Sequence, residues 1–155
     1  MPGIKSFLAA LARDKRGTSL IETALIAPVL ILLATGSVDA GFGYAKQFRV
    51  QQAAARTAEI AGTMGMLSNL GTTMQSEAAS AAGVASGNVT VDIWLECAGV
   101  RQSDVNGTCT GSSPARFASV VITDTYTPLF AAFFSGTGTA NVSVPLRGYA
   151  SVRVQ

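Results

Sequence analysis

The sequence contains no histidine, only two cysteines and few charges, and each shortage excludes a class of site. Charged residues make up 13% of the chain. Without histidine, the chain has neither the commonest general base nor the commonest metal ligand. Two cysteines alone do not complete a tetrahedral zinc set. There is no glycine-rich phosphate loop with a following lysine, and the serines and threonines have no evident base. These absences argue against an enzyme, a metal site and a cofactor.

Ionisable residues are also missing from one long stretch near the N-terminus, between Thr23 and Val38. Counted from Thr18, the apolar run is long enough as a helix to cross a hydrocarbon core of about 30 Å at about 1.5 Å per residue. Glu22 is the single acid at its start. We therefore predict a membrane-spanning helix with one carboxylate near its N-terminal end. Placing an acid there costs free energy, so its presence needs a functional reason.

Basic residues are concentrated before this run. The first 17 residues hold four of the 11 basic residues and one of the nine acidic ones, so seven basic and eight acidic residues remain downstream. Arg13, Lys15 and Arg16 lie directly upstream of the apolar run, and cations at that position keep the N-terminus in the cytoplasm. The downstream chain is then exported. Its nearly neutral charge argues against nucleic acid as a partner.

The length limits the exported part to one domain. After a leader and anchor of about 45 residues, about a hundred remain, which is enough for a single modest core. We expect a cytoplasmic basic leader at residues 1–17, a transmembrane helix at 18–45 and an exported, periplasmic α+β domain at 46–155.

Helical spacing continues beyond the apolar run. Charged residues from Lys46 to Glu59, with Arg49 and Arg56 between them, recur at intervals of three or seven, which places them on one side of a helix. This charged side is either solvated or faces the acids of a neighbour in a fibre. We therefore predict one long helix from about residue 18 to about residue 64.

Alternating apolar residues predict the strands of the exported domain. In the last strand, Val142 and Val144 are expected to face the core, and Pro145 indicates an edge or a bulge in part of the strand. Trp94, on the polar side of the first strand, is interpreted as a packing or interface residue. The fold class is α+β, pilin-like, with the long helix packed on a small antiparallel sheet. The remaining predicted elements are a second helix at 72–85, strands at 89–95, 117–125 and 141–154, and a helical turn at 128–134.

The two cysteines lie in the part predicted to be exported, where the compartment is oxidising. We expect a disulfide between Cys97 and Cys109. It would close a polar loop in which Asn106 and Gly107 signal a turn, and closure of such a loop contributes about 3 kcal/mol on a chain-entropy model. The alternative is two free thiols.

The N-terminal pattern resembles a known class of secreted fibre proteins. Basic residues, then Gly17, then Glu22 five positions later at the start of a spanning helix are similar to the class III signal of type IV pilins and pseudopilins. Within that class the chain resembles the TadE-like proteins of tight-adherence (Flp) pili. This resemblance is carried by Glu22-Thr23-Ala24-Leu25, Pro28, Gly36, Val38-Asp39-Ala40-Gly41, Tyr44 and Gln47, and near the C-terminus by Val120 to Thr123, Tyr126, Pro128, Phe130 and Ala150 to Arg153.

The resemblance implies a minor pilin, pseudopilin or assembly factor. Prepilin peptidase would cleave between Gly17 and Thr18, and Glu22 would be the assembly glutamate. Cleavage would leave the Thr18 ammonium one helical turn from the Glu22 carboxylate. A cation that a neighbouring helix presents to this acid lowers its cost in lipid, and such a pair drives association of the helices. The implied partners are other pilin or pseudopilin subunits through the N-terminal helix, prepilin peptidase, the inner-membrane assembly platform and the lipid bilayer.

The implied location is the bacterial inner membrane, with a single pass and a periplasmic C-terminal domain, and an extracellular fibre after assembly. Three other interpretations remain open. The apolar run is compatible with the apolar region of a secretory signal cleaved before Gly41. It is compatible with a permanent anchor that carries a periplasmic binding or scaffolding module of a secretion system. An exported hydrolase is the third, although no residue suggests a substrate.

Overall fold

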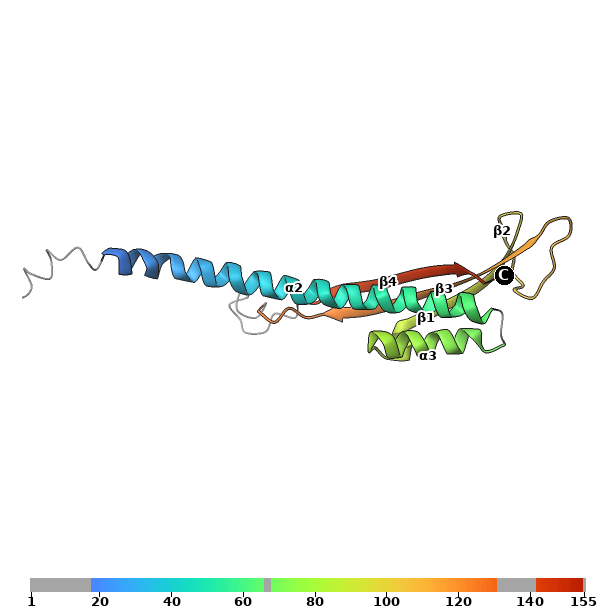
Figure 1. Ribbon diagram of the computed structural model, residues 1–155, viewed down its shortest axis with the longest axis horizontal. Coiled ribbons are helices and arrows are strands. Elements are labelled where there is room, and N and C mark those ends of the chain that lie inside the picture. Colours follow the sequence, from blue (N-terminus) through green and yellow to red (C-terminus); the bar gives the residue numbers. More distant parts are fainter. Residues whose placement is uncertain (1–17, 66–67, 131–141, 155) are drawn as a thin grey trace, which may run out of the picture. The chain divides into compact units, whose positions relative to one another are not determined.

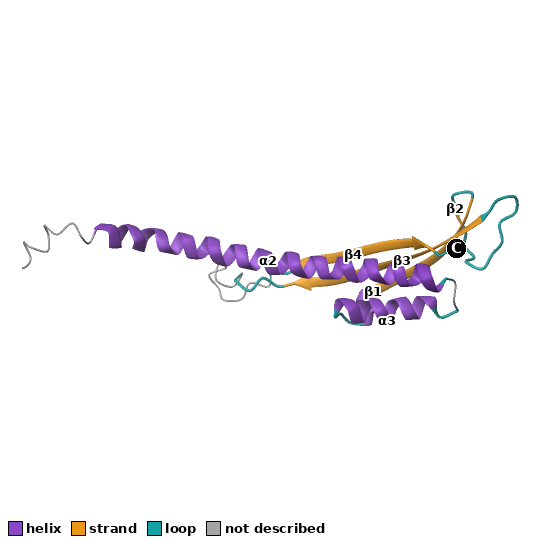
Figure 2. Ribbon diagram, viewed as in Figure 1, coloured by secondary structure: helices purple, strands orange, loops and turns teal. Residues whose placement is uncertain are grey.

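Figure 1 shows the computed structural model of the chain, which describes residues 18–65, 68–130 and 142–154. The chain divides into two compact units, residues 1–39 and 40–155. Long helices and an antiparallel sheet make this an α+β fold, as the sequence predicts (Figure 2). The described elements are α2 (Thr18–Met64), α3 (Leu70–Ala82), the 3-10 turn η2 (Ser86–Asn88), β1 (Val89–Cys97), β2 (Val100–Arg101), β3 (Pro114–Tyr126) and β4 (Val144–Arg153).

Helix α2 is continuous over 47 residues and ends where the sequence predicts. Pro28 lies inside it without interrupting it. At the C-terminus, Gly65 adopts a left-handed conformation with φ of 67°, and its N–H donates a hydrogen bond to the carbonyl of Ala61 at 3.1 Å. A glycine in this conformation stops a helix because a residue with a Cβ is strained there.

The sheet has four antiparallel strands in the order β2-β1-β3-β4. The long strands are in continuous register, with Trp94 opposite Phe117 and Ile122 opposite Gly148. Strand β4 is at one edge, the position that Pro145 predicts. At the other edge, the short β2 pairs only with the last two residues of β1.

One face of the sheet is covered by helix residues after position 40 and by α3 (Figure 2). The helix contributes mainly alanines, and these small side chains let its backbone approach the sheet closely. A Cβ added at Gly148 of β4 would lie only 2.5 Å from the carbonyl oxygen of Val50. The core that results is formed by Val50, Ala53, Ala54, Ala61, Leu70, Met74, Ala78, Ala79, Ala82, Val89, Ala118, Val120 and Ile122.

Polar contacts fix the helix along the sheet. Lys46 Nζ lies 3.0 Å from Asp124 Oδ2 and donates to the carbonyl of Thr125 at 2.7 Å. Of the charged side chains from Lys46 to Glu59, Lys46 therefore has partners within the chain. The others, Arg49, Arg56 and Glu59, are exposed.

Two glutamines of α2 reach the outer edge of β4. Gln47 Nε2 donates to the carbonyl of Arg147 at 2.9 Å. Gln51 makes two hydrogen bonds to one residue. Its Nε2 donates to the carbonyl of Tyr149 at 3.0 Å, and its Oε1 accepts from the N–H of Tyr149 at 3.3 Å. A side-chain amide thus takes the place that a further strand would occupy.

The second helix differs from its predicted bounds of 72–85. It spans Leu70–Ala82 and ends because Gly83, at φ of 72°, donates its N–H to the carbonyl of Ala79 at 2.9 Å. A glycine in an alanine-rich run is a signal for a helix end, and the prediction passed over Gly83 in favour of a later end. The predicted turn at 128–134 lies largely outside the described residues, and its described part, 128–130, is not helical.

The inward positions predicted for the start of the last strand are wrong. Val142 and Val144 are 51% and 44% exposed. Val144 pairs with Tyr126, whose ring lies against α2, since a Cβ at Gly43 would meet it at 3.2 Å. The tyrosine ring fills the place beside the helix, so the smaller valine is left at the surface. Further along the strand, Leu146 is buried as predicted.

Candidate functional site

The first unit of the chain presents an unusual helix surface. Within α2, large apolar side chains from position 20 to position 38 are exposed on every side of the helix, with exposed fractions of up to 75%. One described helix is long and apolar enough to cross a membrane, and 0% of its 18-residue apolar window is buried. The core helix of a soluble protein would be mostly buried. The exposed apolar residues are Leu20, Ile21, Leu25, Ile26, Val29, Leu30, Ile31, Leu32, Leu33 and Val38.

Two hydroxyl groups in this segment are hydrogen-bonded within the helix. Thr35 Oγ1 donates to the carbonyl of Ile31 at 2.9 Å, and Ser37 Oγ donates to the carbonyl of Leu33 at 2.7 Å. A hydroxyl bonded in this way exposes no unpaired donor to lipid. The segment is therefore suited to an apolar surrounding along its length, with one exception.

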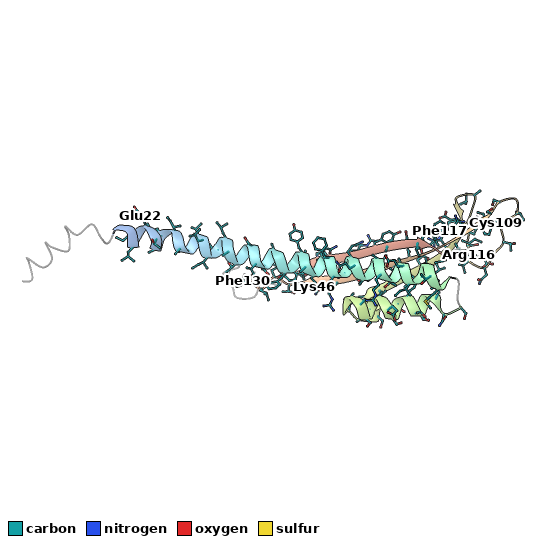
Figure 3. The ribbon with its side chains drawn as sticks, in the orientation of Figure 1. Glu22, Lys46, Cys109, Arg116, Phe117 and Phe130 are labelled. Carbon is teal, nitrogen blue, oxygen red and sulfur yellow. A yellow bond between two sulfur atoms is a disulfide. The ribbon has the colours of Figure 1, made fainter. Side chains whose placement is uncertain are left out.

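That exception is Glu22, whose side chain is exposed near the start of the helix (Figure 3). Among the described residues, no cation or hydrogen-bond donor contacts its carboxylate. A carboxylate in an apolar surrounding is costly until a cation or donor reaches it. Any partner for Glu22 must therefore come from outside the described part of this chain.

The other residues predicted for this site are only partly within the described range. Thr18 is the first described residue of α2. Gly17, the predicted cleavage position, and the cations Arg13, Lys15 and Arg16 lie outside the described residues. Glu22 is thus the one member of the predicted N-terminal site whose side chain the structure describes.

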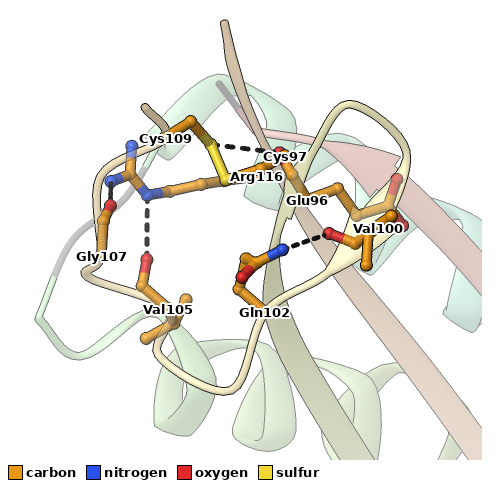
Figure 4. The surroundings of a disulfide bond; sticks show 8 residues. All are labelled: Glu96, Cys97, Val100, Gln102, Val105, Gly107, Cys109 and Arg116. Carbon is orange, nitrogen blue, oxygen red and sulfur yellow. Dashed lines mark hydrogen bonds between the residues drawn. A yellow bond between two sulfur atoms is a disulfide. The ribbon is translucent and has the colours of Figure 1, made fainter. Parts of the chain in front are cut away.

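The second unit contains the disulfide between Cys97 and Cys109, whose Cα atoms are 5.5 Å apart. It closes the loop that follows β1 (Figure 4). Arg116 of β3 supports this loop, donating from Nε to the carbonyl of Val105 at 3.0 Å and from Nη2 to the carbonyl of Gly107 at 3.3 Å. The covalent link and the arginine hold the loop at the end of the sheet.

The sheet face turned away from the helices carries a stacked cluster that includes Trp94. The Trp94 and Phe117 rings stack with centroids 5.5 Å apart, and the Arg101 guanidinium lies 4.8 Å from the Trp94 centroid. Trp94 Nε1 donates to Glu96 at 2.7 Å. Arg101 pairs with Asp92 at 2.8 Å, and this hydrogen bond raises the pKa of the guanidinium.

Sequence reasoning missed this cluster as a unit. The alternation of β1 places Asp92, Trp94 and Glu96 on one face, which the sequence indicates. Arg101 comes from β2, which has two residues and therefore no periodicity to find. Over the ranges that the structure describes, no group of three or more His, Cys, Asp or Glu side chains could hold a metal ion.

Comparison with known proteins bears on the helix alone. The family model described as TadE-like protein matches residues 17–59. No curated protein and no solved structure matches the chain. The matched range contains Glu22, the exposed apolar segment and most of the helix that packs on the sheet. This match confirms the N-terminal part of the resemblance seen in the sequence and is consistent with a TadE-like, pilin-related protein.

Proposed function

We propose that the chain is a minor pilin, pseudopilin or assembly factor of a tight-adherence pilus. It waits in the bacterial inner membrane and then joins or primes an extracellular adhesive fibre. The observation that carries the proposal is the exposed apolar segment of α2 with a single carboxylate, Glu22, that has no partner in the described part of the chain, within a range that matches the TadE-like family. This role is structural, so no catalytic residue and no cofactor are assigned.

The physical argument concerns what surrounds the segment. Residues 20–38 expose apolar side chains on all sides, and such a helix is stable in lipid or among other apolar helices. An acid at the centre of a spanning helix costs about 2.5 to 3.5 kcal/mol, and less near the interface. A cation from a neighbouring subunit removes part of this cost, so Glu22 favours association over dispersal in lipid.

Cleavage after Gly17 supplies a suitable cation. It would make Thr18 the new N-terminus and Glu22 the fifth residue of the mature chain. The ammonium of one subunit would then pair with the Glu22 carboxylate of the next. Prepilin peptidase is the enzyme assigned to this step, and the inner-membrane assembly platform and other pilin subunits are the later partners.

The proposed topology follows from the charges at the N-terminus. Residues 1–17, with Arg13, Lys15 and Arg16, stay in the cytoplasm, residues 18–45 span the membrane, and residues 46–155 are exported. The disulfide between Cys97 and Cys109 supports an oxidising compartment for the last part.

The test is Glu22→Ala in the full-length protein. We expect loss of fibre assembly, counted by electron microscopy of surface pili, with unchanged membrane level and an unchanged melting curve. Glu59→Ala removes an exposed acid from the later part of the same helix and is the matched control, which should assemble normally. Normal pilus formation by Glu22→Ala would contradict the proposal.

A second candidate is a permanent anchor that carries a binding or scaffolding module. It is favoured by the second unit, which has its own core and its own disulfide. Mass spectrometry of the membrane-extracted protein separates the two. A mature N-terminus at Thr18 supports the pilin, an intact Met1 supports the anchor, and a start at Gly41 indicates a secreted domain.

A further inference from the structure

The two edges of the sheet differ in how far their outward main-chain groups are covered by side chains. On β4, the side chains of Gln47 and Gln51 bond the outward main-chain groups of Arg147 and Tyr149. This covers the edge and blocks pairing with another strand. The opposite edge, formed by β1, has no comparable cover over its middle.

The direction of the main-chain groups of β1 follows from two hydrogen bonds at its ends. The carbonyl of Val89 accepts from Gln75 Nε2 at 3.2 Å, and the carbonyl of Leu95 accepts from the N–H of Gln102 at 2.8 Å. Both groups point away from β3. Alternate residues of a strand point the same way, so the N–H and C=O groups of Val91 and Ile93 also point outward.

Among the described residues, no hydrogen bond reaches these outward groups of Val91 and Ile93. Gln75 limits the open stretch at one end, and β2 limits it at the other. The open edge is therefore one short stretch of main-chain groups to which another strand can bind. At about 3.3 Å per residue it suits a strand of roughly five residues.

A groove lies beside part of this edge. It is lined by Gly71, Thr72 and Gln75 of α3 and by residues 89–91 of β1, and it has a volume of about 380 Å³. Gly71 contributes no side chain to this lining, and a Cβ there would lie 3.8 Å from Ile93 Cδ1, at an ordinary contact distance. Side chains of an added strand have room here.

We propose that the open edge of β1 binds an extended segment of another polypeptide by strand addition, and that this segment carries lysine or arginine. The main chain of the segment pairs with Val91 and Ile93, while side chains on one side enter the groove beside α3. This interface is separate from the helix segment around Glu22 and does not depend on it.

The charged residues on β1 and α3 indicate which kind of segment binds at the edge. The charged residues of β1 are Asp92 and Glu96, and that of α3 is Glu77, all of them acids. Arg101 of β2 is at the end of the edge and is paired with Asp92, which offsets that charge and leaves Glu96 and Glu77 as the acids not paired with a cation of β2. Two copies of β1 would bring like charges together, which is unfavourable across paired strands. A basic strand from a different protein complements the edge.

The test uses the full-length protein in detergent micelles and fluorescein-labelled, capped pentapeptides. The probe is VKVKV, followed by fluorescence anisotropy. We expect saturable binding that is about tenfold tighter than that of VEVEV, because the charges then attract rather than repel. VKVKV in which every backbone amide carries an N-methyl group has no N–H to donate on either of its edges, and we expect no binding.

Gly71→Leu fills the groove and leaves the main chain of β1 unchanged. We expect it to weaken VKVKV binding by about tenfold through steric exclusion. Ser80→Leu, at an exposed position of α3 outside the groove, is the matched control and should bind normally. Asp92→Asn should reduce the preference for VKVKV over VEVEV. Fluorescence of Trp94 reports that each variant is folded.

Several results would overturn the proposal. They are absence of VKVKV binding by the folded protein, equal binding of the N-methylated peptide, and binding that Gly71→Leu leaves unchanged. Self-association through β1 that excludes the peptide would assign the edge to a second copy and also overturn it. Fibre assembly is not measured in this test, so its outcome is independent of the Glu22→Ala result.

Discussion

The two parts of helix α2 present different kinds of surface. From position 20 to position 38, the side chains are large, apolar and exposed all round. From position 40 to position 64, one face is buried against the sheet and α3, largely through alanines, and the other is exposed. An all-round apolar helix needs a surrounding that is apolar on every side, whereas a one-sided helix belongs at the boundary of a core. One continuous element therefore serves two different environments.

Glycines show the same contrast. A Cβ added at Gly36, in the first part, would meet nothing within 4 Å. In the second part, a Cβ added at Gly148 of the facing strand would lie 2.5 Å from the helix backbone, and a Cβ added at Gly43 would lie 3.2 Å from the ring of Tyr126. Close approach is thus a property of the part that packs on the sheet. In the first part, packing is left for partners outside the chain.

The largest effect is expected from one substitution placed in each part. Val50→Asp puts an unpaired charge at a position with 0% exposure and should unfold the sheet domain, at a cost of about 3 to 5 kcal/mol. Val29→Asp should leave that domain folded but reduce membrane insertion. Trp94 fluorescence and the membrane-bound fraction measure the two outcomes. Unfolding by both variants would break the comparison.

The disulfide should stabilise only the second unit. Replacing Cys97 and Cys109 together by serine should lower the free energy of unfolding by about 3 kcal/mol, because the open loop gains entropy in the unfolded chain. Denaturant titration followed by Trp94 fluorescence measures the loss. Insertion of the apolar segment should be unchanged, and a lower membrane-bound fraction of this variant would count against the independence of the two units.

Adding one methyl group to a glycine should separate the two parts again. Gly148→Ala should destabilise the sheet domain by about 1 to 3 kcal/mol, since Val50 of the helix must move away. Gly36→Ala is the control and should leave the melting temperature of the sheet domain unchanged, because its Cβ meets nothing. Thermal melts of both proteins in detergent check this, and equal shifts would contradict it.

The smallest effect concerns the covered edge of the sheet. Gln51→Ala removes two hydrogen bonds to Tyr149 and should cost about 0.5 to 1.5 kcal/mol. Gln52→Ala, at the adjacent exposed position, should cost less. Hydrogen exchange of the Tyr149 amide, observed by NMR, is the sharper measurement and should accelerate only in Gln51→Ala. An unchanged rate would show that the glutamine does not protect the edge.

Sequence patterns predicted the long elements well because periodicity accumulates over many residues. The C-terminal end of α2 and the inward positions Val120 and Ile122 of β3 follow from the patterns and are confirmed. Shorter features carried too little signal. The two-residue β2 has no period. The end of α3 is set by the single residue Gly83, whose signal as a helix stop the prediction passed over.

For the functional site, the sequence pattern located the apolar segment and Glu22. It did not predict the burial and pairing of the charged residues that follow this segment. Asp39, the next acid along the chain, is only 9% exposed. Lys46 appeared as part of a solvated charged side, yet it pairs with Asp124, which is 78 positions away. Long-range pairs of this kind depend on how β3 packs beside the helix, and a local pattern does not contain that information.

The most direct test of the account compares cysteine accessibility in the two parts of α2. Leu30→Cys and Glu59→Cys are made singly, with Cys97 and Cys109 retained because their disulfide does not react, and spheroplasts are treated with a membrane-impermeant maleimide. We predict labelling of Glu59→Cys, and labelling of Leu30→Cys only after the membrane is dissolved and the protein denatured. Labelling of Leu30→Cys at the same rate as Glu59→Cys in intact spheroplasts would contradict the claim that residues 20–38 lie in an apolar surrounding.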